Sequence, residues 1–152
     1  MPGHHIRWME QALAQAERAF EAGEVPVGAV VVQKDRIIGR GYNQREQLND
    51  PTAHAEILAI TAAANTLANW RLNGCILYVT KEPCSMCAGA ILNSRLKMVV
   101  FGCYDEQEGC CGSLYQLCSD PHFKINVAVK GGVLEKRCLT LIQDFFKSRR
   151  LV

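Results

Sequence analysis

Three potential metal ligands that lie far apart in the sequence constrain this chain more than any other feature. His54 is separated by a long stretch from Cys84 and Cys87, which form a Cys-x-x-Cys pair after Pro83. A catalytic zinc ion takes three protein ligands and leaves its fourth position to water, and one imidazole with two thiolates supplies that number. Glu56, two residues after His54, then remains as a proton carrier. The fold must therefore bring two distant segments to one point.

The first of these segments is predicted to start a helix. Residues 50–53 have the composition of a turn, and residues 56–67 form a run rich in Ala, Leu and Ile. His54 and Glu56 should therefore lie in the first turn of that helix.

The second segment is also expected at the start of a helix. Residues 75–80 are typical of a buried strand, Pro83 ends that strand, and residues 84–94 are predicted to form a helix that begins with both thiols. The free N–H groups and the dipole at a helix N-terminus favour thiolates and lower the pKa of cysteines placed there. Two helix starts that face each other would build the site.

A redox pair, half of a zinc finger and a structural zinc site are the alternatives for these cysteines. A thioredoxin-like redox pair would leave His54 and Glu56 without a role. A structural zinc would require another cysteine as its fourth ligand. The occurrence of both motifs together, each in a helix-compatible context, favours catalysis.

The length and composition of the chain are those of an ordinary soluble enzyme. At 152 residues it is long enough for one substantial core, so residues 1–152 are expected to form a single domain. Hydrophobic residues make up 49% and charged residues 21%, and no stretch approaches the roughly 20 apolar residues of a membrane span. The N-terminus lacks the basic and apolar regions of a signal peptide. The protein is therefore expected in the cytoplasm, without membrane contact.

Eight cysteines could indicate a disulfide framework, but a chain with a core of this size does not need one. Cys75 and Cys103 lie in apolar, strand-like runs and Cys138 lies in an apolar helix, so these three are predicted to be small buried hydrophobic residues. Cys110 and Cys111 lie in a loop flanked by glycines, where a metal or redox role stays open.

The rest of the chain alternates between predicted helices and strands. An amphipathic first helix carries apolar residues at three- and four-residue steps from Ile6 to Phe20 and ends at Gly23. The other predicted elements are strands at 27–32, 36–42, 97–102 and 125–129, a short helix at 114–118 and a last helix at 134–149. This alternation indicates an α/β fold, a three-layer α/β/α sandwich with a mixed central sheet of about five strands. The active site should lie at the edge of this sheet, below the two helix N-termini.

Five stretches of the chain resemble the bacterial tRNA-specific adenosine deaminases, which belong to the zinc-dependent cytidine and deoxycytidylate deaminase superfamily. These stretches are 24–30 (EVPVGAV), 50–56 (DPTAHAE), 77–80 (LYVT), 82–90 (EPCSMCAGA) and 112–114 (GSL). The resemblance extends from the first helix to residues 144–146 and covers nearly the whole chain. It includes the H-x-E and P-C-x-x-C motifs of zinc deaminases and implies a cytidine deaminase-like fold.

The resemblance implies hydrolytic deamination of adenosine to inosine at the wobble position of a tRNA anticodon loop. One zinc ion per subunit would be held by His54, Cys84 and Cys87, and a zinc-bound hydroxide would attack C6 of the adenine. Glu56 would take the proton of the water, deliver it to N1 and then protonate the departing amine.

The family also suggests which residues contact the substrate. By resemblance, the amide of Asn43 is directed at the flipped nucleoside and Val27 packs against the base. Asp105 matches an aspartate that contacts the ribose of the preceding nucleotide, and Phe146 lies on a helix that meets the anticodon loop. The backbone N–H groups at the two helix starts, around Ala55 and Cys84, are candidate donors to the oxygen of the reaction intermediate. From the residues alone, Asn43 would be a turn residue and Val27 an ordinary core residue.

A tRNA anticodon stem-loop is the partner that the resemblance implies. The basic residues Lys147, Arg149 and Arg150 match family positions that meet the RNA, although a helix C-terminus favours such residues anyway. The formal net charge is only +2. The run 106–108 (EQE) is more acidic than the family leads us to expect and would repel phosphate.

The resemblance further implies a homodimer in which both subunits shape one RNA-binding surface. An apolar strip of Ala88, Ile91 and Leu92 on the second metal-binding helix could support such a dimer. Strips of this kind more often belong to the core of one subunit.

Two other functions stay open at this point. A guanine, cytosine or nucleoside deaminase that acts on a small free substrate shares the core and the metal motif, but residues 109–114 and 145–146 look like those of the tRNA enzymes. A zinc-stabilised RNA-binding module without catalysis would have no need for the carboxylate of Glu56.

Overall fold

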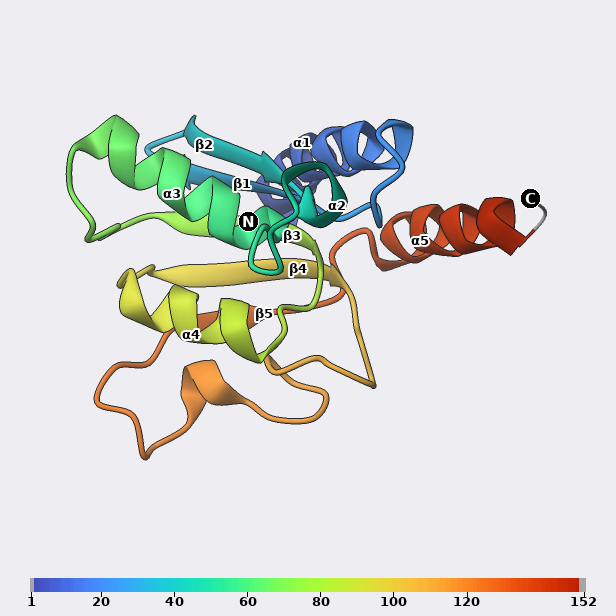
Figure 1. The fold of residues 1–152 in the computed structure, drawn as a ribbon. Coiled ribbons are helices and arrows are strands. Elements are labelled where there is room, and N and C mark those ends of the chain that lie inside the picture. Colours follow the sequence, from blue (N-terminus) through green and yellow to red (C-terminus); the bar gives the residue numbers. More distant parts are fainter. Residues whose placement is uncertain (1, 151–152) are drawn as a thin grey trace.

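The sheet of the protein contains five strands in a mixed arrangement. The computed structural model describes residues 2–150. The strands are β1 (Gly28–Gln33), β2 (Arg36–Tyr42), β3 (Ile76–Lys81), β4 (Met98–Cys103) and β5 (Ala128–Lys130). They lie in the order β2-β1-β3-β4-β5 (Figure 1), with β1 antiparallel to β2 and β3, and β4 parallel to β3 and β5. The predicted mixed sheet of about five strands is confirmed.

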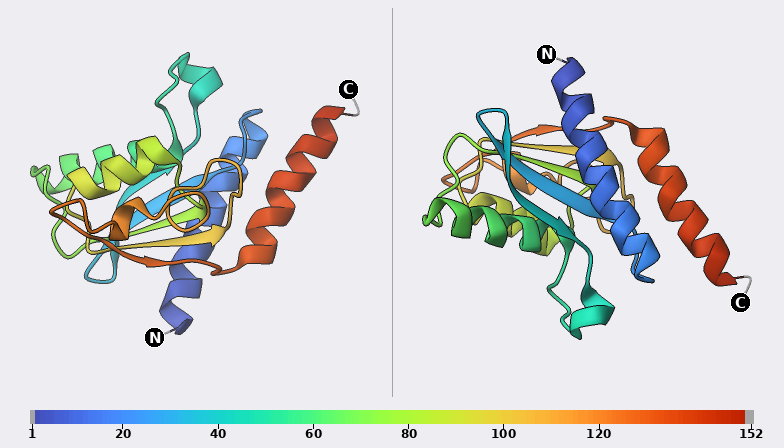
Figure 2. Two further views of the ribbon diagram at one scale, coloured as in Figure 1. Left: turned by 90° about the horizontal axis from the view of Figure 1, so that it is seen from below. Right: turned by 90° about the horizontal axis from the view of Figure 1, so that it is seen from above.

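Helices cover both faces of this sheet, as Figure 2 shows. On one face lie α1 (Pro2–Glu21) and α5 (Glu135–Arg150), and on the other lie α3 (Ala55–Leu67) and α4 (Ser85–Asn93). The predicted three-layer α/β/α sandwich is therefore confirmed. Within the described residues, no helix combines the length and the apolar character that crossing a membrane requires.

The two faces of the sheet carry separate hydrophobic cores. Successive side chains along a strand point to opposite faces. In β1, Val30 and Val32 belong to the core shared with α1 and α5, whereas Ala29 and Val31 belong to the core shared with α3 and α4. These cores fix α3 and α4 against the sheet and so determine where their N-termini lie.

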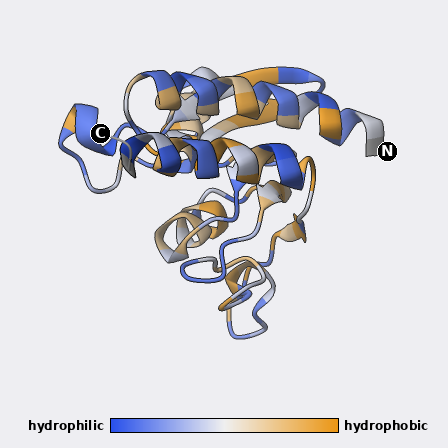
Figure 3. Cartoon of the chain, turned by 90° about the vertical axis from the view of Figure 1, so that its right-hand side faces the viewer, coloured by the Kyte–Doolittle hydropathy of each residue, from blue (hydrophilic) through white to orange (hydrophobic). Residues whose placement is uncertain are grey.

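α1 packs on the sheet through one face. Its buried residues recur at three- and four-residue steps: Trp8, Met9, Ala12, Leu13, Ala16 and Ala19. Figure 3 shows hydrophilic and hydrophobic residues alternating along α1 and α5, as expected for helices with one buried side. Gly23 adopts φ +78° after the last turn, which confirms the predicted end of the helix. Ile6, which the periodicity placed on the buried face, is exposed, because the first turns of α1 project beyond the sheet (Figure 2).

Two predicted elements in the second half of the chain differ from the structure. The last strand is Ala128–Lys130 rather than 125–129, because the N–H of Val127 donates to the carbonyl of Cys118 and pairing with β4 begins only after it. The predicted helix at 114–118 is replaced by a single 3-10 turn, η1 (Leu117–Ser119). The N–H groups of Leu114 and Leu117 donate across the loop to earlier carbonyls instead of building helical turns.

The last helix starts one residue later than predicted, and one short helix was not predicted. α5 begins at Glu135 rather than at residue 134, because Leu134 adopts the left-handed φ of +53°. The short helix α2 (Arg45–Leu48) was not predicted at all. α2 has no buried residue, so its sequence shows no periodic pattern of apolar residues.

Gly28, at the start of β1, allows α1 to lie directly on the sheet. A Cβ atom built on this residue would lie within 3.0 Å of the backbone oxygen of Ala12 and the backbone nitrogen of Ala16. Both atoms belong to α1, so the helix itself would have to move. We expect Gly28→Ala to lower the free energy of unfolding by about 3 kcal/mol, as measured by urea denaturation.

Gly89, in α4, provides the matched control for this substitution. Within the described part of the chain, no neighbouring atom lies within 4 Å of a Cβ built there. Because alanine is the better helix former, Gly89→Ala should leave stability unchanged or raise it by up to about 1 kcal/mol. A Gly28→Ala protein as stable as the wild type would show that α1 can shift outward without loss of packing.

Candidate metal centre and active site

The candidate metal ligands lie where α3 and α4 begin, at the edge of the sheet where β2, β3 and β4 end. His54 is the N-cap residue of α3 and Cys84 is the N-cap residue of α4, both with extended backbone. Neither side chain forms a capping hydrogen bond with its own helix, so both are free to face each other. Glu56 is the second residue of α3 and Cys87 the third residue of α4. The two helix starts thus face each other as predicted, each displaced by one residue from its predicted beginning.

The three candidate ligands approach one another at distances that suit zinc. Nδ1 of His54 lies 3.7 Å from Sγ of Cys84 and 3.6 Å from Sγ of Cys87, and the three ligand atoms all lie within 4.8 Å of one another. Sulfur at about 2.3 Å and nitrogen at about 2.0 Å from a tetrahedral zinc are separated by about 3.5 Å, so this donor set fits the ion. Among residues 2–150 no further histidine, cysteine or carboxylate joins the group, which contradicts the alternative of a four-ligand structural zinc.

The two thiols and the imidazole are arranged to attract a cation. A hydrogen bond from the Cys87 thiol, together with His54, lowers the pKa of Cys84 to about 3. The same hydrogen bond and burial raise the pKa of Cys87. The contact with Cys84 raises the pKa of His54. At neutral pH the group therefore carries a thiolate, and it holds protons that a metal ion must displace.

Glu56 is a buried carboxyl group beside these ligands. Its side chain is 4% exposed and lines the same pocket as His54 and Cys84. Burial raises its pKa, and the negative charge of Cys84 adds to the rise. A carboxyl group with a raised pKa gains and loses a proton closer to neutral pH than an ordinary glutamate, which suits general acid–base catalysis.

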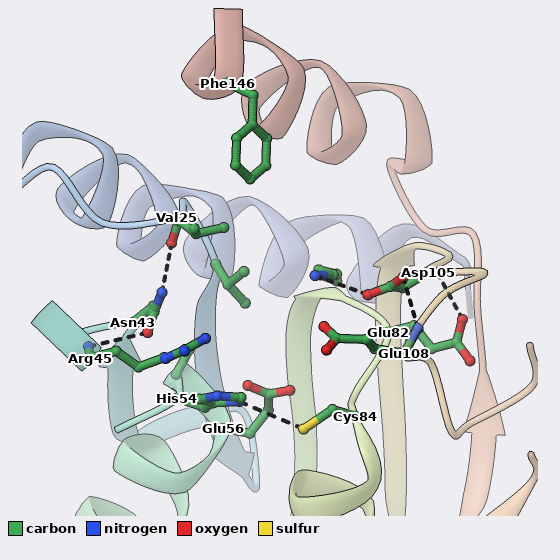
Figure 4. Close-up of a pocket in the computed structure, with 13 residues that line it drawn as sticks. Val25, Asn43, Arg45, His54, Glu56, Glu82, Cys84, Asp105, Glu108 and Phe146 are labelled. Carbon is green, nitrogen blue, oxygen red and sulfur yellow. Dashed lines mark hydrogen bonds and ion pairs between the residues drawn. The ribbon is translucent and has the colours of Figure 1, made fainter. Parts of the chain in front are cut away.

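A pocket of about 260 Å³ opens beside the candidate ligands (Figure 4). Its lining residues are Val25, Val27, Asn43, Arg45, His54, Ala55, Glu56, Lys81, Glu82, Cys84, Asp105, Glu108 and Phe146. Every residue that the sequence singled out for the site belongs to this set except Cys87, which is fully buried. The structure thus brings the predicted site residues together, and their individual roles stay predictions.

Asn43 lies directly after β2 and is held by two backbone groups. Its Nδ2 donates to the carbonyl of Val25 at 3.2 Å, and its Oδ1 accepts from the N–H of Arg45 at 3.4 Å. The turn role considered from the sequence is therefore present, and the side chain lines the pocket as well. Val27 also lines the pocket and packs, partly buried, against the core. Its contact with the base stays a prediction.

Asp105, two residues after β4, is held by an ion pair with Lys81. The distance from Nζ to Oδ2 is 3.0 Å, and the N–H groups of Gln107 and Glu108 donate to Oδ1. Burial opposes the ionisation of Asp105, but Lys81 and these hydrogen bonds outweigh it, so the pKa of the carboxyl is lowered. The side chain is therefore an anion at the pocket, able to accept hydrogen bonds from hydroxyl groups.

The end of α5 contributes an aromatic ring to the pocket. Phe146 is 44% exposed and points from α5 toward the site residues below it (Figure 4). Arg149, expected at the RNA, donates to the carbonyl of Gly23 and is engaged within the protein. Lys147 is exposed, and the side chain of Arg150 lies outside the part of the chain that the structure describes.

Five lining residues were not assigned to the pocket from the sequence: Val25, Arg45, Lys81, Glu82 and Glu108, the last of which was noted only as part of the acidic run 106–108. Val25 and Glu82 lie inside stretches that resemble the family, so the resemblance was the signal that could have identified them as site residues. Arg45 lies on the short exposed helix α2, which has no periodic pattern. Lys81 and Glu108 reach the pocket only because the strand ends meet there, and this is a property of the topology.

The remaining cysteines are buried. This confirms the expectation for three of them, Cys75, Cys103 and Cys138. Cys110 and Cys111 are buried as well, and Sγ of Cys111 lies 3.8 Å from Sγ of Cys118. Within the described residues, none of the three joins a group of three potential metal ligands.

The apolar strip on α4 belongs to the interior of the protomer. Ala88, Ile91 and Leu92 are all buried in the core shared by α3, α4 and the sheet. The core interpretation of this strip is thus confirmed, and the strip gives no support to a dimer.

Comparison with known proteins places the chain in a family. A family model described as MafB19-like deaminase matches residues 3–150. The tRNA-specific adenosine deaminase of Bacillus subtilis (strain 168) is 46% identical over 143 residues, which cover 94% of this chain and 89% of the relative. The chain belongs to the tRNA-specific adenosine deaminase family. Another family member, from Haemophilus influenzae, is also 46% identical, over 95% of this chain and 84% of the relative.

Solved structures show the same relationship. A structure from a study of A-to-I editing by tRNA:A34 deaminases superimposes with a TM-score of 0.85 and 41% identity, over 89% of this chain and 98% of that one. The cytidine deaminase-like fold expected for this family is therefore confirmed. Guanine deaminase from Bacillus subtilis is also 41% identical, but it matches only 64% of this chain and 63% of its own, with a TM-score of 0.62.

Proposed function

We propose that the protein converts adenosine to inosine at the wobble position of a tRNA anticodon loop. The observation that carries the proposal is the group of three zinc-type ligands with the buried carboxyl of Glu56 beside it, at one pocket. Full-length similarity to enzymes named tRNA-specific adenosine deaminase supports this substrate. The structural neighbour studied for editing at the wobble position supports the site of reaction.

The residues of the pocket divide the reaction between them. A zinc ion held by His54, Cys84 and Cys87 would supply an acidified water molecule as the nucleophile. Glu56 takes one proton from that water and delivers it to N1 of the adenine, and it then takes the remaining proton from the new hydroxyl on C6 and delivers it to the amino group. A C6–O bond forms, the C6–N bond breaks and ammonia leaves. The backbone N–H of Ala55 is the proposed donor to the new oxygen.

The base and its neighbours would be held by the rest of the lining. Asn43 and Val27 lie together on the β1–β2 side of the pocket, where they would bind the edge and the face of the adenine. Asp105 would accept a hydrogen bond from the ribose of the preceding nucleotide, and the exposed ring of Phe146 offers a surface on which a base can stack. The net charge of +2 and the acidic residues 106–108 mean that such local contacts, rather than a basic surface, must select the RNA.

We further propose that the chain is a single deaminase domain, that it forms a homodimer, and that it acts in the cytoplasm where tRNA is used. The two cores share one sheet, which supports the single domain. The dimer rests on the family resemblance alone. Light scattering of the purified protein tests it directly.

A guanine deaminase is the second candidate, because an enzyme of that kind shares 41% identity with part of this chain. It shares the fold and chemistry but matches less than two thirds of either chain. The tRNA-specific relatives match 94–95% of this chain, which favours the RNA substrate.

The test compares RNA with free bases in one assay. An anticodon stem-loop with adenosine at position 34 is incubated with zinc-loaded protein, and its nucleosides are analysed by mass spectrometry. Free adenine, guanine and cytosine are incubated in parallel and assayed for ammonia. We expect inosine at position 34 and no comparable turnover of the bases. Ammonia from guanine alone would replace the proposal by its rival.

A further inference from the structure

Glu82, a buried carboxylate that the proposed mechanism does not use, anchors one wall of the pocket. It is 3% exposed, and its two oxygens accept four hydrogen bonds from the segment 105–113. Oε1 accepts from the N–H of Asp105 at 3.0 Å and from the hydroxyl of Ser113. Oε2 accepts from the N–H of Cys111 at 3.1 Å and from the N–H of Ser113 at 2.8 Å.

The packing of this segment against Glu82 is close enough to exclude a side chain at one position. A Cβ atom built on Gly109 would lie within 3.0 Å of Cδ and Oε2 of Glu82 and of the carbonyl oxygen of Asp105. The backbone carbonyl of Pro83 also accepts from the N–H of Cys110 at 2.9 Å. Pro83 therefore binds the segment 105–113 through its backbone carbonyl, and Glu82 binds it through its side-chain carboxylate.

The segment that Glu82 holds carries two residues of the pocket. Asp105 and Glu108 both line the pocket, and Asp105 Oδ1 accepts from the N–H of Glu108 at 3.2 Å. Figure 4 shows Glu82, Asp105 and Glu108 together on the side of the pocket opposite Asn43. The N–H of Asp105 donates to Glu82, and the carboxylate of Asp105 forms an ion pair with Lys81. Both the backbone and the side chain of Asp105 are therefore held in place.

We infer that Glu82 is a positioning residue that sets the place of Asp105 in the substrate pocket. It acts on the RNA through Asp105 and makes no contact with the reacting atoms. The inference rests on the proposed function, because the effect of a displaced Asp105 is expected on the binding of a ribose.

A glutamine at position 82 cannot reproduce this arrangement, although it has the same size. An amide offers one accepting oxygen and one donating NH₂ group. If its oxygen faces Cys111 and Ser113, its NH₂ faces the N–H of Asp105, which loses its acceptor. The opposite orientation leaves two N–H groups without an acceptor. In the better orientation, then, Asp105 is the residue that is released.

The experiment measures deamination of the adenosine-34 stem-loop by zinc-loaded wild type, Glu82→Gln, Asp105→Asn and the double variant. We expect Glu82→Gln to raise KM about tenfold with kcat within about threefold of wild type and with full zinc content. Because both changes act on one contact, the double variant should be little worse than Asp105→Asn alone. Ser113→Ala, which removes only one hydroxyl and keeps all three N–H bonds, should change KM by less than about threefold.

Glu106→Gln is the matched control, because Glu106 lies on the same segment with an exposed side chain. It removes the same charge, and because the acidic run 106–108 would repel phosphate, loss of charge alone should leave KM unchanged or lower it, so a rise in KM confined to Glu82→Gln is a positioning effect. Hydrogen exchange gives a readout that needs no RNA. The amide of Asp105 should exchange at least about tenfold faster in Glu82→Gln, while the amides of Cys111 and Ser113 change less and those of α1 keep their wild-type rates.

The outcomes separate this inference from the proposed function. A wild-type protein that leaves the stem-loop unchanged defeats the proposed function, and the exchange rates still decide whether Glu82 holds the segment. Wild-type KM and exchange rates in Glu82→Gln would overturn the inference. Loss of zinc with a fall in kcat at constant KM would also overturn it, since Glu82 would then support the metal centre rather than Asp105.

Discussion

Glu56→Gln is expected to lower kcat for the RNA substrate by a factor of about 100 to 10,000 while zinc stays bound. The amide has the shape of the carboxyl but cannot take a proton from water and return it to the base. Because Glu56 is buried with a raised pKa, a neutral amide is well tolerated at this position, and stability should not fall. The fall in kcat would therefore show that proton transfer is lost while the structure of the site is preserved.

The measurement is single-turnover deamination of the stem-loop, with zinc quantified on the same samples and unfolding followed by urea. Glu46→Gln, an exposed change on α2, is the control and should behave like the wild type. A Glu56→Gln protein with near-normal turnover would remove Glu56 from the mechanism. Loss of zinc from the Glu56→Gln protein would show that Glu56 is a zinc ligand. Unchanged RNA affinity and unchanged biological output would favour a zinc-stabilised RNA-binding module.

The sequence was sufficient for the metal centre because its chemistry depends on residue type and spacing. Only a few side chains bind zinc, and the N-cap positions of His54 and Cys84 follow from the turn before α3 and the proline before α4. Buried strands such as β1 and β3 were equally visible, because each is apolar on both faces.

The far side of the pocket was not predictable in the same way. The segment 105–113 is held by backbone N–H groups that donate to one carboxylate. Because every residue except proline has a backbone N–H, the sequence does not show which of these groups form such bonds. The same holds for α2, whose N–H groups at Glu46 and Gln47 donate to the buried carboxylate of Glu24. The loop 105–113 and the short helix α2 are thus both anchored by buried carboxylates, and apolar periodicity in the sequence cannot reveal such anchors.

Cys87→Ala is expected to lose its zinc and to fall to background activity. Cys87 supplies one of the three candidate ligands found among residues 2–150, and it is fully buried behind the pocket where no solvent molecule can easily replace it. Zinc content by elemental analysis and deamination of the stem-loop should fall together. Cys103→Ala, the same change at a buried cysteine in β4 outside the group, should keep both.

The same centre should bind zinc more weakly as the pH falls. A metal ion must displace protons from His54 and Cys87, whose pKa values are raised, whereas Cys84, with its pKa lowered to about 3, is already a thiolate. Groups with raised pKa values hold their protons at low pH, so the affinity for zinc must rise with pH and each binding event must release protons. Competition with a chelator at pH 6 and pH 8 measures the change, and proton release is followed with an indicator dye. An affinity that is independent of pH would mean that all three ligands are already deprotonated, and the assigned proton-sharing between Cys84 and Cys87 would be wrong.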